Sequence, residues 1–309
     1  MQVADLHCDL LSYLADDTRH TAYDPASRAS IAMLQAGGVA LQTLAIFTET
    51  KHGSTQKGMK QAESFVELSQ KYPVLGKEIK TMVSIENASG FCEENEPLDQ
   101  GLERLQKFYE KTGRIAYVSL TWNTENRFGG GNATSIGLKE DGRQLLRWMN
   151  GKKIAIDLSH TSDRLAGDIL DEIENLDIVP IASHSNFRKV ANHPRNLPDH
   201  LAQEIAARGG VIGLNFVRVF LGSKGAEDFI RQVEHADHLG LLNHFCFGAD
   251  FFADHALPPE LQYLLPMFNP GFDTAACYPK VIELLRKHLS HDIVEKIAYK
   301  NLTQFLGSV

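Results

Sequence analysis

Two side chains that can bind a metal stand two residues apart near the beginning of the chain. His7 and Asp9 follow a short apolar run that begins at Val3. In an extended chain, residues two apart point to the same side, so both side chains can reach one cation. Imidazole and carboxylate together suit zinc or a similar divalent metal. A lone His-x-Asp is common by chance, so the prediction of a metal site depends on further ligands.

Four more groups of this kind stand directly after other apolar runs of the chain. They are Glu86, His160 in Asp-Leu-Ser-His, His184 in Ala-Ser-His, and Asp250 in Gly-Ala-Asp. Taken singly, a histidine at a strand end is more often structural than a ligand. All six groups would nevertheless meet on the catalytic face of a barrel if every run is a barrel strand. The joint pattern therefore favours a metal site.

Three histidines and three carboxylates suit a hydrolase with two metals. Ions about 3.5 to 4 Å apart require one bridging carboxylate and flanking ligands on each side. Glu86 is central in sequence order and is the expected bridge. His7 and Asp9 would then hold one metal, and His160 and His184 the other.

Asp250 is left to accept and donate protons in this arrangement. The metals would acidify a bridging water toward neutrality and polarise a scissile carbonyl, so an amide could be attacked at physiological pH. Hydrogen-bonded surface or core roles are expected for the histidines at positions 20, 52, 235, 238, 244, 255, 288 and 291.

The six groups can meet only if the elements before them form a closed parallel sheet. The chain alternates short β-rich runs with longer stretches of helical spacing. Strands are expected at residues 3–7, 39–47, 79–85, 115–120, 154–158, 178–182, 211–215 and 245–248. Helices are expected at 59–71, 101–111, 141–150, 162–175, 198–208, 226–239 and 278–289, with a last helix at 292–306. Strand-then-helix repeated eight times predicts a (β/α)8 TIM barrel, with an open doubly wound sheet as the alternative.

Composition places this barrel among soluble globular enzymes. The 309 residues are 43% apolar, enough for a large core, and nothing divides them, so a single catalytic domain over 1–309 is expected. The net charge is -8 with scattered Lys and Arg, which argues against nucleic acid as a partner. No apolar run of about 18 residues occurs, so no membrane span or anchor is expected. Four cysteines without a CxxC pair indicate reduced thiols and a cytoplasmic location.

The chain resembles the membrane dipeptidase (renal dipeptidase) family of zinc peptidases, peptidase family M19. The resemblance runs from Asp5 to Asp250 and is most specific over residues 183–199, SHSNFRKVANHPRNLPD, which is similar to the SHS…HPRN segment of the family. Residues 157–161 (DLSHT) and 210–216 (GVIGLNF) are similar to two further family blocks.

This resemblance implies a (β/α)8 barrel with two Zn²⁺ ions per chain, bridged by Glu86. The ligands would fall on His7, Asp9, Glu86, His160 and His184, with an aspartate at the position of Asp250 that handles the proton. The family's substrate-binding arginine matches Arg195, whose guanidinium would clamp the C-terminal carboxylate of a dipeptide. The resemblance also allows a D-residue at the C-terminal position of the substrate and a homodimer. His193 and Asp157 would support or orient neighbouring groups.

The chain departs from the family near the substrate. Mammalian members read Leu-Thr-His, with that histidine contacting substrate, where this chain has Leu-Thr followed by Trp122 and Asn123. Trp122 or Asn123 must replace that role or forgo it. The tyrosine common in the family after Asn-Phe is Val217 here. These changes leave the metal chemistry untouched and leave the substrate preference open.

The sequence therefore predicts a zinc-dependent dipeptidase acting on small dipeptides. The first alternative is another amidohydrolase reaction on the same metals, on a lactone, a cyclic amide or an N-acyl amino acid. The second is a barrel that has lost catalysis and only binds a peptide or metabolite.

A glycine-rich segment, residues 127–132 (RFGGGN), follows the fourth expected strand. It lacks the Lys-Ser/Thr of a phosphate-binding loop. A mobile loop over the site is the preferred interpretation, and a plain flexible connection is an equal alternative. Phe128, Phe251 and Phe252 are expected either to wall the pocket or simply to pack.

Overall fold

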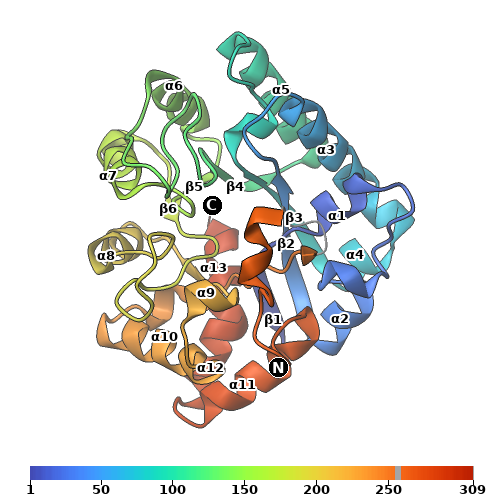
Figure 1. Ribbon diagram of the computed structural model, residues 1–309, viewed down its shortest axis with the longest axis vertical. Helices are drawn as coiled ribbons and strands as arrows, with labels where there is room; N and C mark the ends of the chain where they lie inside the picture. Colours follow the sequence, from blue (N-terminus) through green and yellow to red (C-terminus); the bar gives the residue numbers. More distant parts are fainter. Residues whose placement is uncertain (255–258, 309) are drawn as a thin grey trace.

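Eight parallel strands form the centre of the molecule. The structure is a computed structural model and describes residues 1–254 and 259–308. The strands are β1 Val3–Cys8, β2 Val39–Phe47, β3 Lys80–Glu86, β4 Ile115–Ser119, β5 Ala155–Asp157, β6 Pro180–Ile181, β7 Ile212–Leu214 and β8 Phe245–Phe247. Each coincides with one of the eight expected runs, and the helices form a ring outside them (Figure 1).

The sheet closes on itself. Its strand order is β6-β5-β4-β3-β2-β1-β8-β7. A parallel bridge between Ala182 and Ile212 joins its two ends, and the Gly213 N–H donates to the Ala182 carbonyl at 2.8 Å. The TIM barrel is therefore confirmed, and the open doubly wound sheet is wrong.

The strands are continuous apolar runs because both of their faces are covered. All six residues of β1 and all five of β4 are buried. The barrel interior is filled by side chains of the strands and is covered at one end by the C-terminal helix α13 (Asn301–Ser308). The interior cluster contains Ala4, Leu6, Leu41, Ala116, Tyr117, Ala155, Ile181, Val211, Cys246, Leu302, Phe305 and Leu306. This packed interior leaves the carboxyl ends of the strands as the place for a site.

The expected helices are all present. They are α3 Ser54–Lys71, α5 Leu98–Thr112, α6 Glu140–Met149, α7 Asp163–Glu172, α8 Asp199–Ala207, α10 Glu227–His238 and α11 Tyr278–Arg286. Two of them, α3 and α5, are longer than expected, and four, α7, α8, α10 and α11, are shorter. The last one, expected at 292–306, is divided into α12 (His291–Glu295), a π-helical turn (Lys296–Lys300) and α13. The structure also has short helices that periodicity did not predict: α1 Leu10–Asp16, α2 Ile31–Ala36, α4 Val74–Lys77 and α9 Arg218–Leu221. Segments of four to seven residues are too short to show a helical repeat.

The glycine-rich segment is packed into the structure rather than lying over the site as a free loop. A Cβ atom at Gly131 would lie 1.9 Å from the Trp122 carbonyl oxygen, so only glycine permits this backbone approach. The Asn132 N–H donates to the His160 carbonyl at 2.8 Å, and Gly131 forms a bridge with Thr161. The glycines thus hold this segment against the turn that carries His160.

Two of the three phenylalanines considered as pocket walls are core residues. Phe128 is fully buried and packs against Phe91, with ring centroids 5.9 Å apart. Phe251 is buried against Phe216 and Phe268. Phe252 is only partly buried and also packs against Phe268.

No helix within residues 1–254 and 259–308 combines the length and the apolar character that crossing a membrane requires. The cysteines at positions 8, 92, 246 and 277 are all buried and unpaired.

Candidate metal centre

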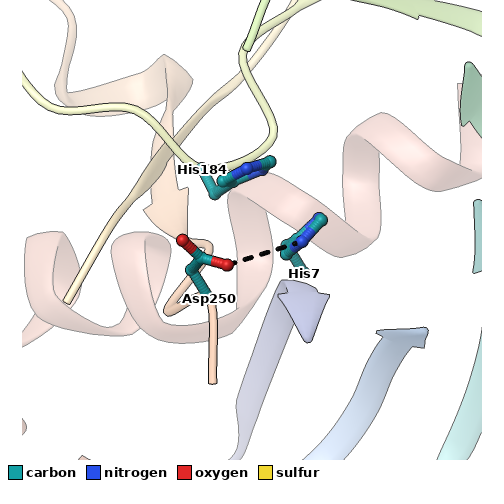
Figure 2. A group of neighbouring side chains, drawn as sticks. All are labelled: His7, His184 and Asp250. Atoms are coloured by element: carbon teal, nitrogen blue, oxygen red, sulfur yellow. Dashed lines mark ion pairs between the residues drawn. The ribbon is translucent and has the colours of Figure 1, made fainter. Parts of the chain in front are cut away.

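The six predicted groups meet at the carboxyl ends of the strands. Among the described residues, three sets have ligand atoms close enough to hold a metal ion: His7–Asp9–Glu86, Glu86–His160–His184, and His7–His184–Asp250. The third set is drawn in Figure 2, where His7 stands at the end of β1 with the Asp250 carboxylate beside it and the His184 ring above both. Each of the six residues is at most 8% exposed. The barrel therefore brings together groups up to about 240 residues apart in sequence.

Glu86, the last residue of β3, lies between the two halves of the cluster. Its Oε2 is 3.1 Å from Nε2 of His7. Its Oε1 is 3.0 Å from Nε2 of His160 and 3.8 Å from Nε2 of His184. One carboxylate thus faces a different histidine set with each oxygen, as a carboxylate shared by two cations would.

Each histidine turns its Nε2 atom into the cluster because its Nδ1 atom is already engaged. Nδ1 of His7 is 2.6 Å from the Tyr117 hydroxyl, and Nδ1 of His160 is 2.8 Å from Oδ1 of Asn123. Nδ1 of His184 is 2.6 Å from the Ser183 hydroxyl. Such contacts fix the ring orientation of metal-binding histidines.

Burial shapes the electrostatics of the cluster. It raises the pKa of Glu86 to about 8 and that of Asp250 to about 6. Burial also lowers the pKa of His160 and of His184 well below the ordinary value, so both rings are neutral at physiological pH. A divalent cation would restore the charged form of the carboxylates and take up the ring lone pairs.

The donor set fits a metal. Nε2 of His7 and Oδ1 of Asp9 are buried without a hydrogen-bond partner among the described residues. Nε2 of His160 and Nε2 of His184 are only 3.0 Å apart. Buried lone pairs that face one another are costly unless a cation lies between them. Imidazole nitrogens and carboxylate oxygens suit zinc or a similar divalent metal.

Asp250 follows β8 and is fixed on one side only. Its Oδ2 accepts a hydrogen bond from the Asn215 amide at 2.9 Å, while its Oδ1 lies 3.6 Å from Nε2 of His7 (Figure 2). Its backbone φ is +63°, and that of His160 is +66°, an uncommon conformation for residues with a side chain. Both residues stand in the turn directly after a strand, which aims their side chains at the cluster.

Arg195 is 4% exposed and lies beside the cluster. Its guanidinium donates to the Ser185 hydroxyl at 2.9 Å and to the His184 carbonyl at 3.1 Å. Its Nε has no partner among the described residues. Of the five N–H donors of an arginine, several therefore remain for an anionic group. His193 contacts the backbone of Arg195: its ring Nδ1 accepts a hydrogen bond from the main-chain N–H of Arg195 at 3.1 Å.

Trp122 makes apolar ring contacts, whereas Asn123 makes a polar contact with His160. The partly buried Trp122 ring packs edge-on against Phe47 at 5.3 Å and lies 6.1 Å from the His160 ring. It therefore adds an apolar wall beside His160. Asn123 is turned toward His160 Nδ1, and its predicted contact with substrate stays a prediction.

Asp5 is a buried residue of the site that sequence reasoning did not select. It accepts hydrogen bonds from the His7 N–H, the Gln42 amide, the Ala249 N–H and the Tyr278 hydroxyl at 2.6 to 2.9 Å. These contacts tie the ends of β1 and β8 together. Its position two residues before His7, on the same side of the strand, was the available signal.

Other histidines lie outside the cluster. His20, His235 and His244 contact the Tyr13 carbonyl, the Asp199 carboxylate and the Gly210 carbonyl respectively. His255 lies outside the described residues.

A closed eight-stranded barrel with this donor set at its mouth defines the class of amidohydrolase-like TIM barrels. The sequence matches the model of the membrane dipeptidase family (peptidase family M19) over residues 1–309, and the chain belongs to this family. Metallo-dipeptidases are thus its relatives.

Individual relatives are distant. An uncharacterised protein in the pqqA 5' region of Klebsiella pneumoniae is 28% identical over 249 residues, which cover 75% of this chain and 83% of that protein. Dipeptidase tcpJ of Claviceps purpurea is 30% identical over 207 residues, 63% of this chain but only 45% of that protein. A metallopeptidase of Rhodobacter sphaeroides, solved with a phosphinate mimic of the dipeptide L-Ala-D-Ala, superposes with a TM-score of 0.82 at 21% identity and 99% coverage of both chains. That likeness shows the fold.

Proposed function

We propose that this chain is a binuclear zinc dipeptidase that hydrolyses the single amide bond of a dipeptide. The observation that carries the proposal is the position of Glu86, whose two oxygens face the Nε2 atoms of His7 and of His160 at 3.1 and 3.0 Å. His7 and Asp9 would hold one metal, His160 and His184 the other, with Glu86 as the bridge. When bound, the two metals would supply an acidified water and polarise the scissile carbonyl.

Asp250 is the group proposed to move the proton. Burial raises its pKa to about 6, so the carboxyl can both accept and release a proton near neutrality. The Asn215 amide holds Oδ2, which leaves Oδ1 free on the side of the cluster. Asp250 would accept a proton from the attacking water and donate one to the leaving amine.

Arg195 is the proposed reader of the dipeptide carboxylate. Among the described residues, Arg195 is the buried arginine beside the three carboxylates of the cluster, and a substrate anion would be attracted to its guanidinium. Its fixed fork geometry suits a bidentate pair with a carboxylate. A longer peptide carries no carboxylate at that distance from the scissile bond, which would restrict the enzyme to dipeptides.

Residues 1–309 are proposed to act as one catalytic domain. The buried, unpaired thiols support a reducing compartment, and we propose the cytoplasm. A homodimer stays a prediction.

A second candidate function follows from Trp122. An apolar ring beside His160 replaces a hydrogen-bonding imidazole, which favours a substrate with less need for a donor at this point. Hydrolysis of a lactone, a cyclic amide or an N-acyl amino acid would use the same cluster.

The test is a panel of L,L and L,D dipeptides together with lactones, cyclic amides and N-acyl amino acids, assayed on protein of measured zinc content. Hydrolysis of dipeptides supports the proposal. Two equivalents of zinc with turnover only of the other compounds would replace it by the second candidate.

A further inference from the structure

Asp157 is a further buried carboxylate that is not one of the six groups of the cluster. Asp157, the last residue of β5, has no exposed surface and belongs to none of the three sets of side chains that could hold a metal ion. Its Oδ1 accepts from the main-chain N–H groups of Ser159 and Ser183 at 3.0 and 2.8 Å. Its Oδ2 accepts from the hydroxyls of Ser119 and Ser183 at 2.7 and 2.6 Å.

The Ser183 hydroxyl connects this carboxylate to the cluster. The same oxygen lies 2.6 Å from Oδ2 of Asp157 and 2.6 Å from Nδ1 of His184. A hydroxyl has one proton to donate, and a carboxylate can only accept. Ser183 therefore donates to Asp157 and must accept from His184.

A neutral imidazole carries one proton. Because Ser183 accepts from Nδ1, that proton lies on Nδ1 and the Nε2 lone pair faces Glu86 and His160. The tautomer of His184 is thus set by a chain of two hydrogen bonds that ends at a buried carboxylate.

We propose that Asp157 and Ser183 are positioning residues that hold His184 in its metal-binding tautomer. The proposal rests on the proposed metal centre. A role in positioning explains why the Asp157 carboxylate is buried outside the cluster. Metal affinity would then depend on Asp157 although Asp157 is not itself a ligand.

Replacing Asp157 by asparagine gives a sharp test because the two side chains have the same shape. The main-chain N–H groups of Ser159 and Ser183 can only donate, so the amide oxygen of the asparagine must take the place of Oδ1. Its NH₂ group must then take the place of Oδ2. It would then donate to the hydroxyls of Ser119 and Ser183. The Ser183 proton would be released toward Nδ1 of His184, and the ring proton would move to Nε2.

The experiment compares wild type, Asp157→Asn and a control, Ser119→Ala. The control also removes a hydroxyl from Oδ2 of Asp157, but that hydroxyl does not contact His184. Histidine ¹⁵N NMR on the full chain, with and without zinc, reports the tautomer, and calorimetry reports zinc affinity. In wild type and Ser119→Ala we expect the His184 proton on Nδ1. In Asp157→Asn we expect it on Nε2, with one zinc bound about 10 to 100-fold more weakly.

The outcomes separate the hypotheses. A proton that stays on Nδ1 in Asp157→Asn overturns the proposal, even if the lost charge weakens zinc binding. If wild type binds no zinc, the proposed function fails, while the tautomer of the metal-free chain still tests the hydrogen-bond chain. Should Asp157→Asn not fold, Ser183→Ala takes its place, with both tautomers expected, and a single Nδ1–H form contradicts the proposal.

Discussion

Oδ1 of Asn123 lies 2.8 Å from Nδ1 of His160, so this asparagine contacts a proposed metal ligand. An amide oxygen at this position accepts the ring proton and leaves Nε2 free to face Glu86. Asn123 is therefore expected to orient His160, and its contact with substrate stays a separate prediction.

Asn123→Ala is expected to weaken zinc binding by about 10 to 100-fold, because His160 loses the group that orients it. Asn123→Asp keeps an acceptor at the same place and is the matched control, with zinc affinity close to wild type. Calorimetric titration with zinc measures both. A variant that binds zinc normally and changes only the KM for dipeptides would instead make Asn123 a substrate contact.

Asp250→Asn tests the proposed proton transfer. The amide keeps the shape of the side chain but cannot accept a proton, so kcat is expected to fall by about 10² to 10⁴-fold with both metals retained. Metal analysis and steady-state kinetics on one preparation provide the readouts. Because Asp250 also lies within reach of a metal held by His7 and His184, loss of one metal in this variant would mean that Asp250 is a ligand. Undiminished turnover would remove it from the mechanism.

Arg195→Ala is expected to raise the KM for dipeptides about 10 to 100-fold, because two charge-assisted hydrogen bonds to the substrate carboxylate are lost. Dipeptide amides, which lack that carboxylate, supply the control and should be cleaved at similar rates by wild type and variant. Equal losses on the acid and the amide would indicate that Arg195 acts through the Ser185 hydroxyl and the His184 carbonyl, its present partners.

Zinc affinity is expected to rise with pH. The pKa of Glu86 is raised from 4.5 to about 8 by burial, so in metal-free protein at neutral pH the carboxyl holds a proton that zinc must displace. Calorimetry in buffers of different ionisation enthalpy counts the released protons. No proton release near neutral pH would show that Glu86 is ionised before zinc binds.

The same shift has an opposite effect on the stability of the metal-free protein. The folded chain holds a proton on Glu86 that the unfolded chain releases above pH 4.5, so this contribution to stability is complete below pH 4.5 and is lost as pH rises toward about 8. Urea unfolding across that range, with Glu86→Gln as the control that cannot titrate, would reveal it. A wild type and a control with the same pH dependence would contradict it.

Sequence predicted the strands and the six groups at their ends because both follow from one physical rule. Strands covered on both faces are continuous apolar runs, and a polar residue that ends such a run lies at the barrel mouth. The partners of the histidines could not be predicted in this way. Tyr117 reaches His7 from β4, a contact that depends on the register of strands far apart in sequence.

The structure of the glycine-rich segment, residues 127–132, could not be predicted from its composition. Its composition suggested mobility, whereas Gly131 is needed where two backbones touch, next to the Trp122 carbonyl. A sequence shows that a glycine is present but not which neighbour requires it.

Zinc content and dipeptide turnover, measured together on purified wild type and on Arg195→Ala, decide whether this chain is a two-metal dipeptidase. We expect two equivalents of zinc in both proteins, and dipeptide hydrolysis that Arg195→Ala loses mainly through a raised KM. Two equivalents of zinc without hydrolysis of any dipeptide would contradict the substrate assignment, and fewer than two would contradict the shared bridge at Glu86.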